Sequence, residues 1–157
     1  MSDRERLADP LTHSVIGAFF EVYRTLGFGF LEHLYVMAIE RELRARGHRV
    51  GREVSIPVWY KGDHLGTQRL DLIVDDVLVI EIKSTLDLPR TAERQVYNYL
   101  SATNLRVGLL LHFGPEPKVY RIESRRPRAT KEEKVLPPSH PTHPSHPVPP
   151  LGPGGQP

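Results

Sequence analysis

Two stretches near the start of the chain carry apolar residues at helical spacing. Between residues 15 and 26, and again between residues 31 and 43, apolar side chains recur every three or four positions and so lie on one face of a helix. Gly27 and Gly47 follow the two stretches, at positions where glycine commonly ends a helix. The pattern predicts two consecutive amphipathic helices.

The chain then becomes rich in β-branched and aromatic residues, which is typical of strands. The expected strands cover residues 54–60, 69–74, 77–83, 106–113 and 118–122, and a third helix covers residues from about 90 to 103. Pro57 has no backbone N–H for a neighbouring strand, so the first strand is expected at the edge of a sheet. The predicted order is helix, helix, three strands, helix and two strands, an α/β (α+β) arrangement.

The composition changes near residue 124. Ten of the 15 prolines lie at Pro127 or later, among Ser, Thr, His and Gly residues. Such a segment has too little apolar surface to offset the entropy lost on folding. We therefore expect one domain at residues 1–123 and a disordered Pro/His-rich tail at residues 124–157. Metal binding by its regularly spaced histidines, and docking of its prolines on a partner domain, are alternatives to a tail without a specific function.

The distribution of charge limits how the chain can bind nucleic acid. The formal net charge is +2, but residues 124–157 hold five basic and two acidic residues, which leaves 16 basic and 17 acidic residues in residues 1–123. The expected domain is therefore not basic as a whole, and a contact with nucleic acid must use a local patch.

Composition also excludes several classes of protein. The absence of cysteine excludes disulfides, zinc–thiolate sites and thiol nucleophiles. No apolar run approaches the roughly 20 residues of a membrane span, and the polar start lacks the apolar stretch of a signal peptide. We expect a cytoplasmic protein that binds no membrane.

The strongest chemical signal lies between Arg69 and Lys83, in the segment RLDLIVDDVLVIEIK. Outside the turn, the two predicted strands are almost wholly apolar except for Asp71, Glu81 and Lys83. Burying an unpaired charge costs several kcal/mol. A Glu-x-Lys pair alone often occurs by chance as a solvated pair at a strand end, but an aspartate ten residues upstream on the preceding strand favours a functional site.

These residue types suit the hydrolysis of phosphodiester bonds with a metal ion. The carboxylates of Asp71 and Glu81, with the Ile82 carbonyl and water, are the oxygen ligands that Mg2+ or Mn2+ prefers. A bound ion lowers the pKa of water and stabilises charge on phosphate oxygens. Lys83 can orient the attacking water or stabilise the developing negative charge.

The site requires a particular strand register. In a two-residue hairpin at Asp75-Asp76, Asp71 would face Ile80, and its side chain would lie on the opposite face from Glu81. A three-residue loop or a bulge places Asp71 opposite Glu81 on one face. Because aspartate tolerates the left-handed conformation that such a turn demands, we predict this odd register.

Two helical positions are further candidates. Glu32 lies early in the second helix, where it is either an acid that complements the helix dipole or a third acidic ligand, direct or through water. Gln95 and Tyr99 are four residues apart and share a face of the third helix. They are either a surface polar residue beside a core aromatic one, or a pair that positions the substrate.

Together these residues resemble the GxxExxY proteins, a branch of the PD-(D/E)xK nuclease superfamily. The signature is Gly29-x-x-Glu32-x-x-Tyr35, and the likeness runs from about Leu11 to Arg121. The supporting segments are IGA at 16–18, EVY at 21–23, LGFG at 26–29, PVWYKG at 57–62, RLD at 69–71 and EIK at 81–83. Gly29-Phe30 stands where members often have a proline-containing turn, which affects loop shape and not chemistry.

The resemblance implies a restriction-endonuclease-like core with a mixed central β-sheet flanked by helices. Asp71 and Glu81 match the metal-binding acids, Lys83 the catalytic lysine and Glu32 the acid on the preceding helix. The Gln-x-x-x-Tyr spacing of the third helix is similar to that of the RecB-like branch. The residues expected to position substrate are Gln95, Tyr99 and Tyr35.

The expected activity is the hydrolysis of nucleic acid, with DNA favoured over RNA. Candidate phosphate contacts, each with solvated surface charge as the alternative, are Arg52, Lys61, Arg69, Arg90 and Arg94. A partner protein that delivers the substrate would fit the weak charge, and a homodimer is an alternative because sites on this fold often work as dimers. The alternative function is a non-catalytic nucleic-acid-binding or adaptor module that retains the fold.

Overall fold

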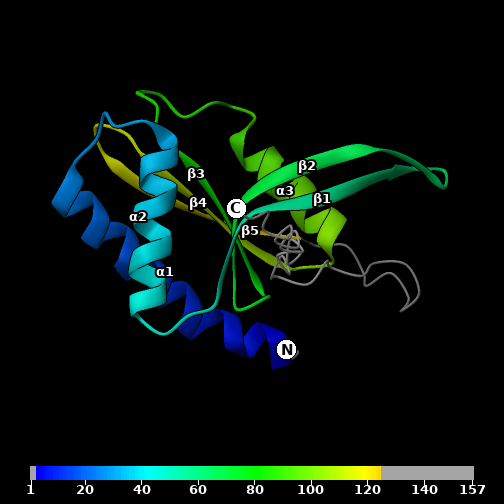
Figure 1. Ribbon diagram of the computed structural model, residues 1–157, viewed down its shortest axis with the longest axis horizontal. Coiled ribbons are helices and arrows are strands. Elements are labelled where there is room, and N and C mark those ends of the chain that lie inside the picture. The colour runs from blue at the N-terminus through cyan, green and yellow to red at the C-terminus, as the bar shows by residue number, and fades with distance from the viewer. Residues whose placement is uncertain (1–2, 125–157) are drawn as a thin grey trace, which may run out of the picture.

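Three helices and one five-stranded sheet form the part of the chain that the computed structural model describes, residues 3–124 (Figure 1). The elements are α1 (Asp3–Leu26), α2 (Glu32–Ala45), β1 (Val50–Tyr60), β2 (Asp63–Val74), β3 (Leu78–Lys83), α3 (Ala92–Thr103), β4 (Val107–Phe113) and β5 (Pro117–Glu123). The predicted order is confirmed. The expected tail and its histidines lie outside the described residues, and no helix within those residues is long and apolar enough to cross a membrane.

The sheet is mixed, as expected. Its strands follow one another in the order β1-β2-β3-β4-β5, and all neighbours are antiparallel except β3 and β4, which are parallel. A parallel pair needs a crossover connection, and α3 forms part of it. Helices α1 and α2 cover one face of the sheet and α3 covers the other (Figure 1).

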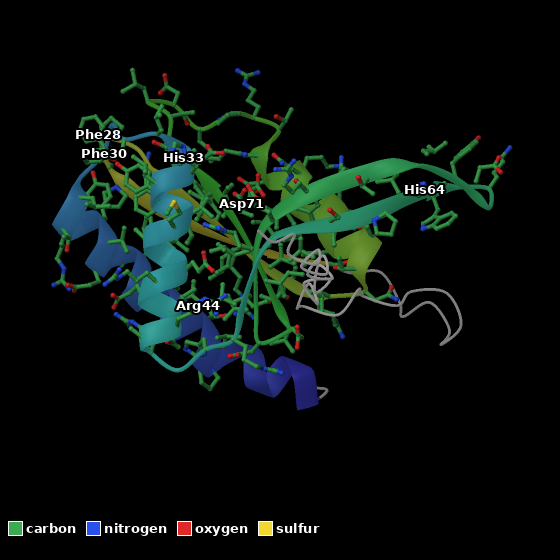
Figure 2. All side chains as sticks on the ribbon, viewed as in Figure 1. Phe28, Phe30, His33, Arg44, His64 and Asp71 are labelled. Atoms are coloured by element: carbon green, nitrogen blue, oxygen red, sulfur yellow. The ribbon has the colours of Figure 1, made fainter. Side chains whose placement is uncertain are left out.

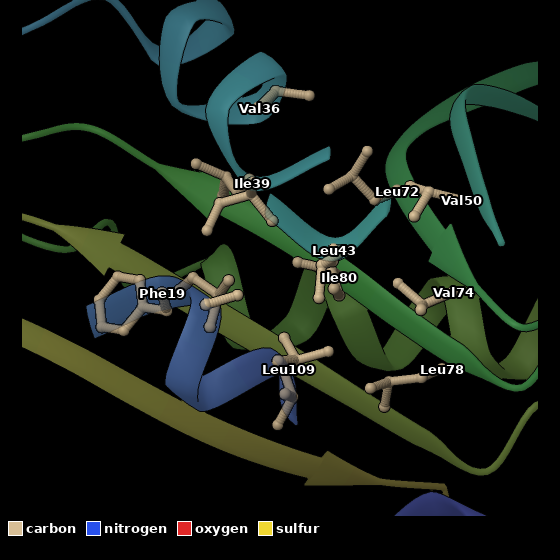
Figure 3. Packing of buried hydrophobic residues seen from close by; sticks show 14 of the residues in the cluster. Phe19, Val36, Ile39, Leu43, Val50, Leu72, Val74, Leu78, Ile80 and Leu109 are labelled. Carbon is tan, nitrogen blue, oxygen red and sulfur yellow. The ribbon is translucent and has the colours of Figure 1, made fainter. Parts of the chain in front are cut away.

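Alternation along β3 divides the core between the two faces. Ile80 and Ile82 pack with residues of α1 and α2, such as Phe19 and Ile39 (Figure 3). Val79, one position away, packs on the other face with residues of α3. All of β3 except Lys83 is buried, which agrees with its almost continuous apolar sequence.

The helix predictions succeeded where the apolar pattern was strong. In α2 the buried residues are Tyr35, Val36, Ile39 and Leu43, which lie on one helical face. Helix α1 begins at Asp3, well before the apolar pattern at residue 15, and it contains Pro10. The missed first part of α1 is polar and gives no periodic signal.

Strands β1 and β2 form a hairpin longer than predicted. The sequence 63–68 is mostly polar and was expected as part of the connection, but it pairs with residues 56–60 of β1 across a bulge. Beyond Leu72 no further pairs join β2 to β3, so the rest of the hairpin extends away from the sheet (Figure 1). Strand β1 lies at the sheet edge, as Pro57 predicted.

The predicted odd register between β2 and β3 is confirmed. Leu72 pairs with Ile80 and Val74 pairs with Leu78, so the same register places Asp71 opposite Glu81. Three residues, 75–77, make the connection. Asp75 and Asp76 both have a left-handed backbone, with φ of 50° and 58°.

A hydrogen-bond network holds this turn against two other segments. The Asp75 carboxylate accepts the Arg49 N–H at 2.8 Å and lies 2.8 Å from Nδ1 of His48. The other ring nitrogen of His48 lies 2.7 Å from Oγ of Ser14 on α1. Asp76, in contrast, contacts only an exposed arginine, Arg49, at 3.3 Å among the ion pairs of the described residues.

Asp75→Ala should therefore destabilise the protein more than Asp76→Ala. Both substitutions place alanine at a positive φ, so the backbone strain is similar in the two variants. The difference reflects the bonds of Asp75 to Arg49 and His48, and we expect about 1–2 kcal/mol in the free energy of unfolding. Urea denaturation of both variants measures it, and equal losses would show that the network does not hold the turn.

Candidate active site

The predicted chemical residues meet at the carboxyl end of β3. Glu81 and Lys83 extend from the same side of the strand as Val79, the side that α3 covers. Asp71 joins them from β2, at the base of the long hairpin (Figure 2). The N-terminal end of α2, with Glu32, lies at the same end of β3.

Asp71 connects the two strands at the point where their pairing ends. Its Oδ2 accepts the backbone N–H of Ile82 at 2.8 Å. The last regular pair is Leu72 with Ile80. Beyond it, the Ile82 N–H binds the Asp71 carboxylate instead of a backbone carbonyl of β2. This bond fixes the carboxylate beside the backbone that separates Glu81 from Lys83.

Glu81 and Lys83 form a buried ion pair. Lys83 Nζ donates to Glu81 Oε1 at 2.7 Å, and the two side chains are 16% and 3% exposed. The second carboxylate oxygen of Glu81, Oε2, is buried and has no hydrogen-bond partner among the described residues. A buried carboxylate oxygen without a partner is costly and points to a missing ligand.

The environment shifts the pKa of all three groups. Burial raises the pKa of Glu81 to about 7, and the nearby charge of Asp71 adds to the effect. Burial also raises the pKa of Asp71, although the Ile82 N–H acts in the opposite direction. Burial would lower the pKa of Lys83, but the bond to Glu81 and the surrounding carboxylates outweigh it and raise that pKa. Lys83 therefore stays charged near neutral pH.

The donor set fits a hard divalent cation. Two crowded carboxylates that resist ionisation together, and one unpartnered carboxylate oxygen, would both be relieved by a positive charge. Within residues 3–124 no three His, Cys, Asp or Glu residues are grouped to hold a metal. Asp71 and Glu81 would thus need backbone carbonyls and water to complete the shell, as is usual for Mg2+.

Glu32 binds backbone instead of joining the other two acids. Its Oε2 accepts the Ser84 N–H at 3.2 Å, and its Oε1 lies 3.9 Å from Lys83 Nζ. The role of Glu32 as a third acidic ligand, direct or through water, stays a prediction. The structure gives Glu32 a second role, which is to fix the chain just after Lys83.

The structure places Tyr35 in the core beneath the loop between α1 and α2, and its predicted role in positioning substrate stays a prediction. Tyr35 is fully buried, and its ring stacks on Phe113 with centroids 4.0 Å apart. Its hydroxyl donates to Gly27 O at 2.7 Å and accepts the Phe30 N–H at 3.2 Å. Tyr35 therefore fastens the loop that leads into Glu32.

Gln95 and Tyr99 connect α3 to β2. Gln95 Nε2 donates to the Tyr99 hydroxyl at 2.8 Å, and that hydroxyl donates to Arg69 O at 2.8 Å. Tyr99 is buried, which raises its pKa and keeps its proton in place. The pair supports the backbone two residues before Asp71, and the predicted substrate contact of Gln95 remains a prediction.

The predicted phosphate contacts differ in the partners that the structure gives them. Arg52 pairs with Glu40, Arg69 lies 3.5 Å from Glu53, and Lys61 lies over the Tyr60 ring at the far tip of the hairpin. The guanidinium of Arg94 lies over the Tyr97 ring, and Arg90 is exposed just before α3. Their role as phosphate contacts remains a prediction.

Sequence reasoning missed Ser84 and His112. Ser84 bonds Glu32 through its N–H and donates its hydroxyl to Phe30 O at 2.6 Å. His112 pairs with Lys83 in register, is buried, and donates from Nε2 to Thr85 O at 2.8 Å. His112 is the one polar side chain in the apolar strand 107–113, and a polar residue in such a strand indicates a functional site, as it did for Glu81. Ser84 gave none, because serine is common after strands.

Comparison with known protein families identifies the family of the chain. The family described as the PD-(D/E)XK nuclease superfamily matches residues 9–124. Among solved structures, the chain is similar to the crystal structure of SSO0001, with 22% identity, a TM-score of 0.49, and coverage of 59% of this chain and 49% of that one. The chain thus spans about half the length of that structure, and a likeness at this level says nothing about activity. No curated protein matches the chain.

Glu81→Gln should change how stability depends on pH when divalent metal is removed. Because folding raises the pKa of Glu81 from 4.5 to about 7, its contribution to stability is full below its unfolded pKa and is lost as the pH rises through 7. Relative to Glu81→Gln, the wild type should lose on the order of 2 kcal/mol between about pH 5 and pH 8, at about 1.4 kcal/mol per pKa unit.

Denaturation in EDTA at the two pH values measures this difference. Glu116→Gln, on the exposed turn before β5, is the matched control and should follow the wild type. A constant difference between wild type and Glu81→Gln across the range would contradict the raised pKa.

Proposed function

Because the chain belongs to the PD-(D/E)XK nuclease superfamily, we propose that it is a divalent-metal-dependent nuclease whose centre is Asp71, Glu81 and Lys83. The observation that supports this most is the buried, unpartnered Oε2 of Glu81, beside the half-buried Asp71 carboxylate and a charged lysine. A purely structural ion pair would need neither a second acid nor a buried carboxylate oxygen without a hydrogen bond.

Asp71 and Glu81 would hold Mg2+ or Mn2+, with the Ile82 carbonyl as a further ligand. When bound, such an ion makes water more acidic and neutralises charge on the phosphate. The Ile82 N–H holds the Asp71 carboxylate in place, so this ligand is oriented before a metal arrives. Preorganised ligands lose little entropy on binding.

Lys83 supplies the fixed positive charge of the centre. Its neighbours raise its pKa, so the ammonium stays protonated and stabilises negative charge on the phosphate as water attacks. Glu81 and Glu32 lie 2.7 Å and 3.9 Å from Nζ and restrict where it points. Glu32 and Tyr99 hold the backbone on either side of the centre, at Ser84 and Arg69, and Glu32 is also placed to contact the metal shell through water.

The finer assignment to the GxxExxY branch rests on the contacts of its signature residues. Gly29 has a φ of 104°, Glu32 accepts the Ser84 N–H, and Tyr35 fastens the loop. Each signature position thus has a physical role in placing the start of α2 beside Lys83. DNA is the proposed substrate.

Purified protein should cleave DNA in Mg2+ or Mn2+ and not in EDTA. Lys83→Met keeps most of the side-chain volume and removes the charge, so cleavage should fall at least about 100-fold. Asp71→Asn should abolish both cleavage and the rise in melting temperature that metal produces. Gel assays on single-stranded, double-stranded and branched DNA, and on RNA, measure the first effect, and thermal melts measure the second.

Surface variants of the same type serve as controls. Lys118→Ala on β5 and Asp63→Asn at the hairpin turn change exposed residues and should leave cleavage unchanged. Cleavage that persists in EDTA or in Lys83→Met would contradict the proposed centre. Absence of both cleavage and metal binding would favour a non-catalytic module.

A further inference from the structure

The loop between α1 and α2 is held in one conformation by its hydrogen bonds. Gly27 and Gly29 have φ of 69° and 104°, a region that favours glycine. Gly27 N donates to Tyr23 O at 2.7 Å, and the buried Tyr35 hydroxyl binds both Gly27 O and Phe30 N. Ser84 completes the set by donating to Phe30 O.

This fixed loop nevertheless exposes two phenyl rings. Phe28 and Phe30 are 49% and 48% exposed, and Figure 2 shows them beside the N-terminal end of α2, near His33. One side of the Phe30 ring packs edge-on against Tyr35, with centroids 6.2 Å apart, which sets the orientation of the ring. Leaving such rings in water forfeits part of the roughly 1.5–3 kcal/mol that burial of each would yield, as expected for a binding surface.

The loop is coupled directly to the proposed centre. Ser84, which holds Phe30 O, follows Lys83 in the chain, and Glu32, two residues after Phe30, lies 3.9 Å from Lys83 Nζ. Because this loop is bonded to the residue next to Lys83, a nucleic acid that is bound at Lys83 and continues along the loop would meet the exposed rings of Phe28 and Phe30.

We infer that Phe28 and Phe30 form a stacking platform for unpaired bases, so that the substrate is single-stranded next to the cleaved bond. This inference rests on the proposed nuclease function. Aromatic side chains bind single strands by stacking on base faces, which a continuous duplex hides in its own stack. Among the described residues, Arg52 and Arg69 pair with glutamates, so part of their charge is already neutralised, whereas the two rings are free to stack.

Binding in EDTA tests the platform without cleavage. The probes are a fluorescein-labelled single strand of about 12 nucleotides, the same sequence as a blunt duplex, and a single strand carrying 2-aminopurine. Phe28→Ala/Phe30→Ala should weaken single-strand binding about tenfold or more and remove the quenching of 2-aminopurine by stacking. Duplex binding should change less than about twofold.

Matched variants separate stacking from general apolar contact. Phe28→Tyr/Phe30→Tyr keeps a flat ring at each position and should retain single-strand binding, whereas Phe28→Leu/Phe30→Leu should lose it. Phe20→Ala, a 41% exposed phenylalanine on α1, should have no effect. Because Phe30 contacts Tyr35, Phe28→Ala is also measured alone, and thermal melts confirm that each variant is folded.

Three outcomes would overturn the inference: leucine variants that bind like the wild type, alanine variants that keep single-strand affinity, or a wild-type dimer in ultracentrifugation that the alanine variants abolish. The last result would make the loop a self-association surface. If the wild type cleaves DNA while the alanine variants bind normally, the platform fails and the nuclease stands. If nothing is cleaved but single-strand binding needs both rings, the nuclease fails and the platform stands.

Discussion

The geometry of the candidate centre depends on the number of residues in one turn. With three residues between Val74 and Leu78, the side chains of Asp71 and Glu81 lie on one face of the sheet. One residue fewer would turn Asp71 to the opposite face and leave Glu81 with Lys83 alone. The left-handed Asp75 holds this turn through contacts to backbone and imidazole, so a structural network at one end of the strand pair determines the chemistry at the other.

The centre is also an energetically unfavourable site within a core that otherwise stabilises the fold. The rest of β3 is apolar and packs on both faces, whereas Glu81 is buried with a like charge nearby. Buried charges of the same sign are typical of functional sites, because they destabilise the fold and the surrounding structure must offset that effect. Here the stabilising groups are the Ile82 N–H and Lys83, and Glu32 and Tyr99 fix the backbone around them.

Sequence alone was enough for the features that depend on local pattern. Residues that are close in the sequence determine these features. They are the apolar periodicity of residues 31–43, the charges within apolar strands, and the three-residue turn that places Asp71 opposite Glu81. Contacts between distant segments were not accessible. Tyr35 looked like a site residue because it belongs to a signature, but its packing on Phe113 depends on how α2 and β4 meet. The polar strand 63–68 pairs because the turn at 61–62 brings it beside β1, against its own composition.

The parallel pairing of β3 with β4 has a consequence for folding. Asp71, Glu81 and Lys83 lie within one local β-hairpin, and short hairpins close within microseconds. His112 reaches Lys83 only after the chain has crossed over through α3, and Glu32 reaches Ser84 across 52 residues. Contacts of such sequence separation form slowly. We therefore expect the reactive groups to come together early, in water, and to lose their solvent only when the last long-range contacts close.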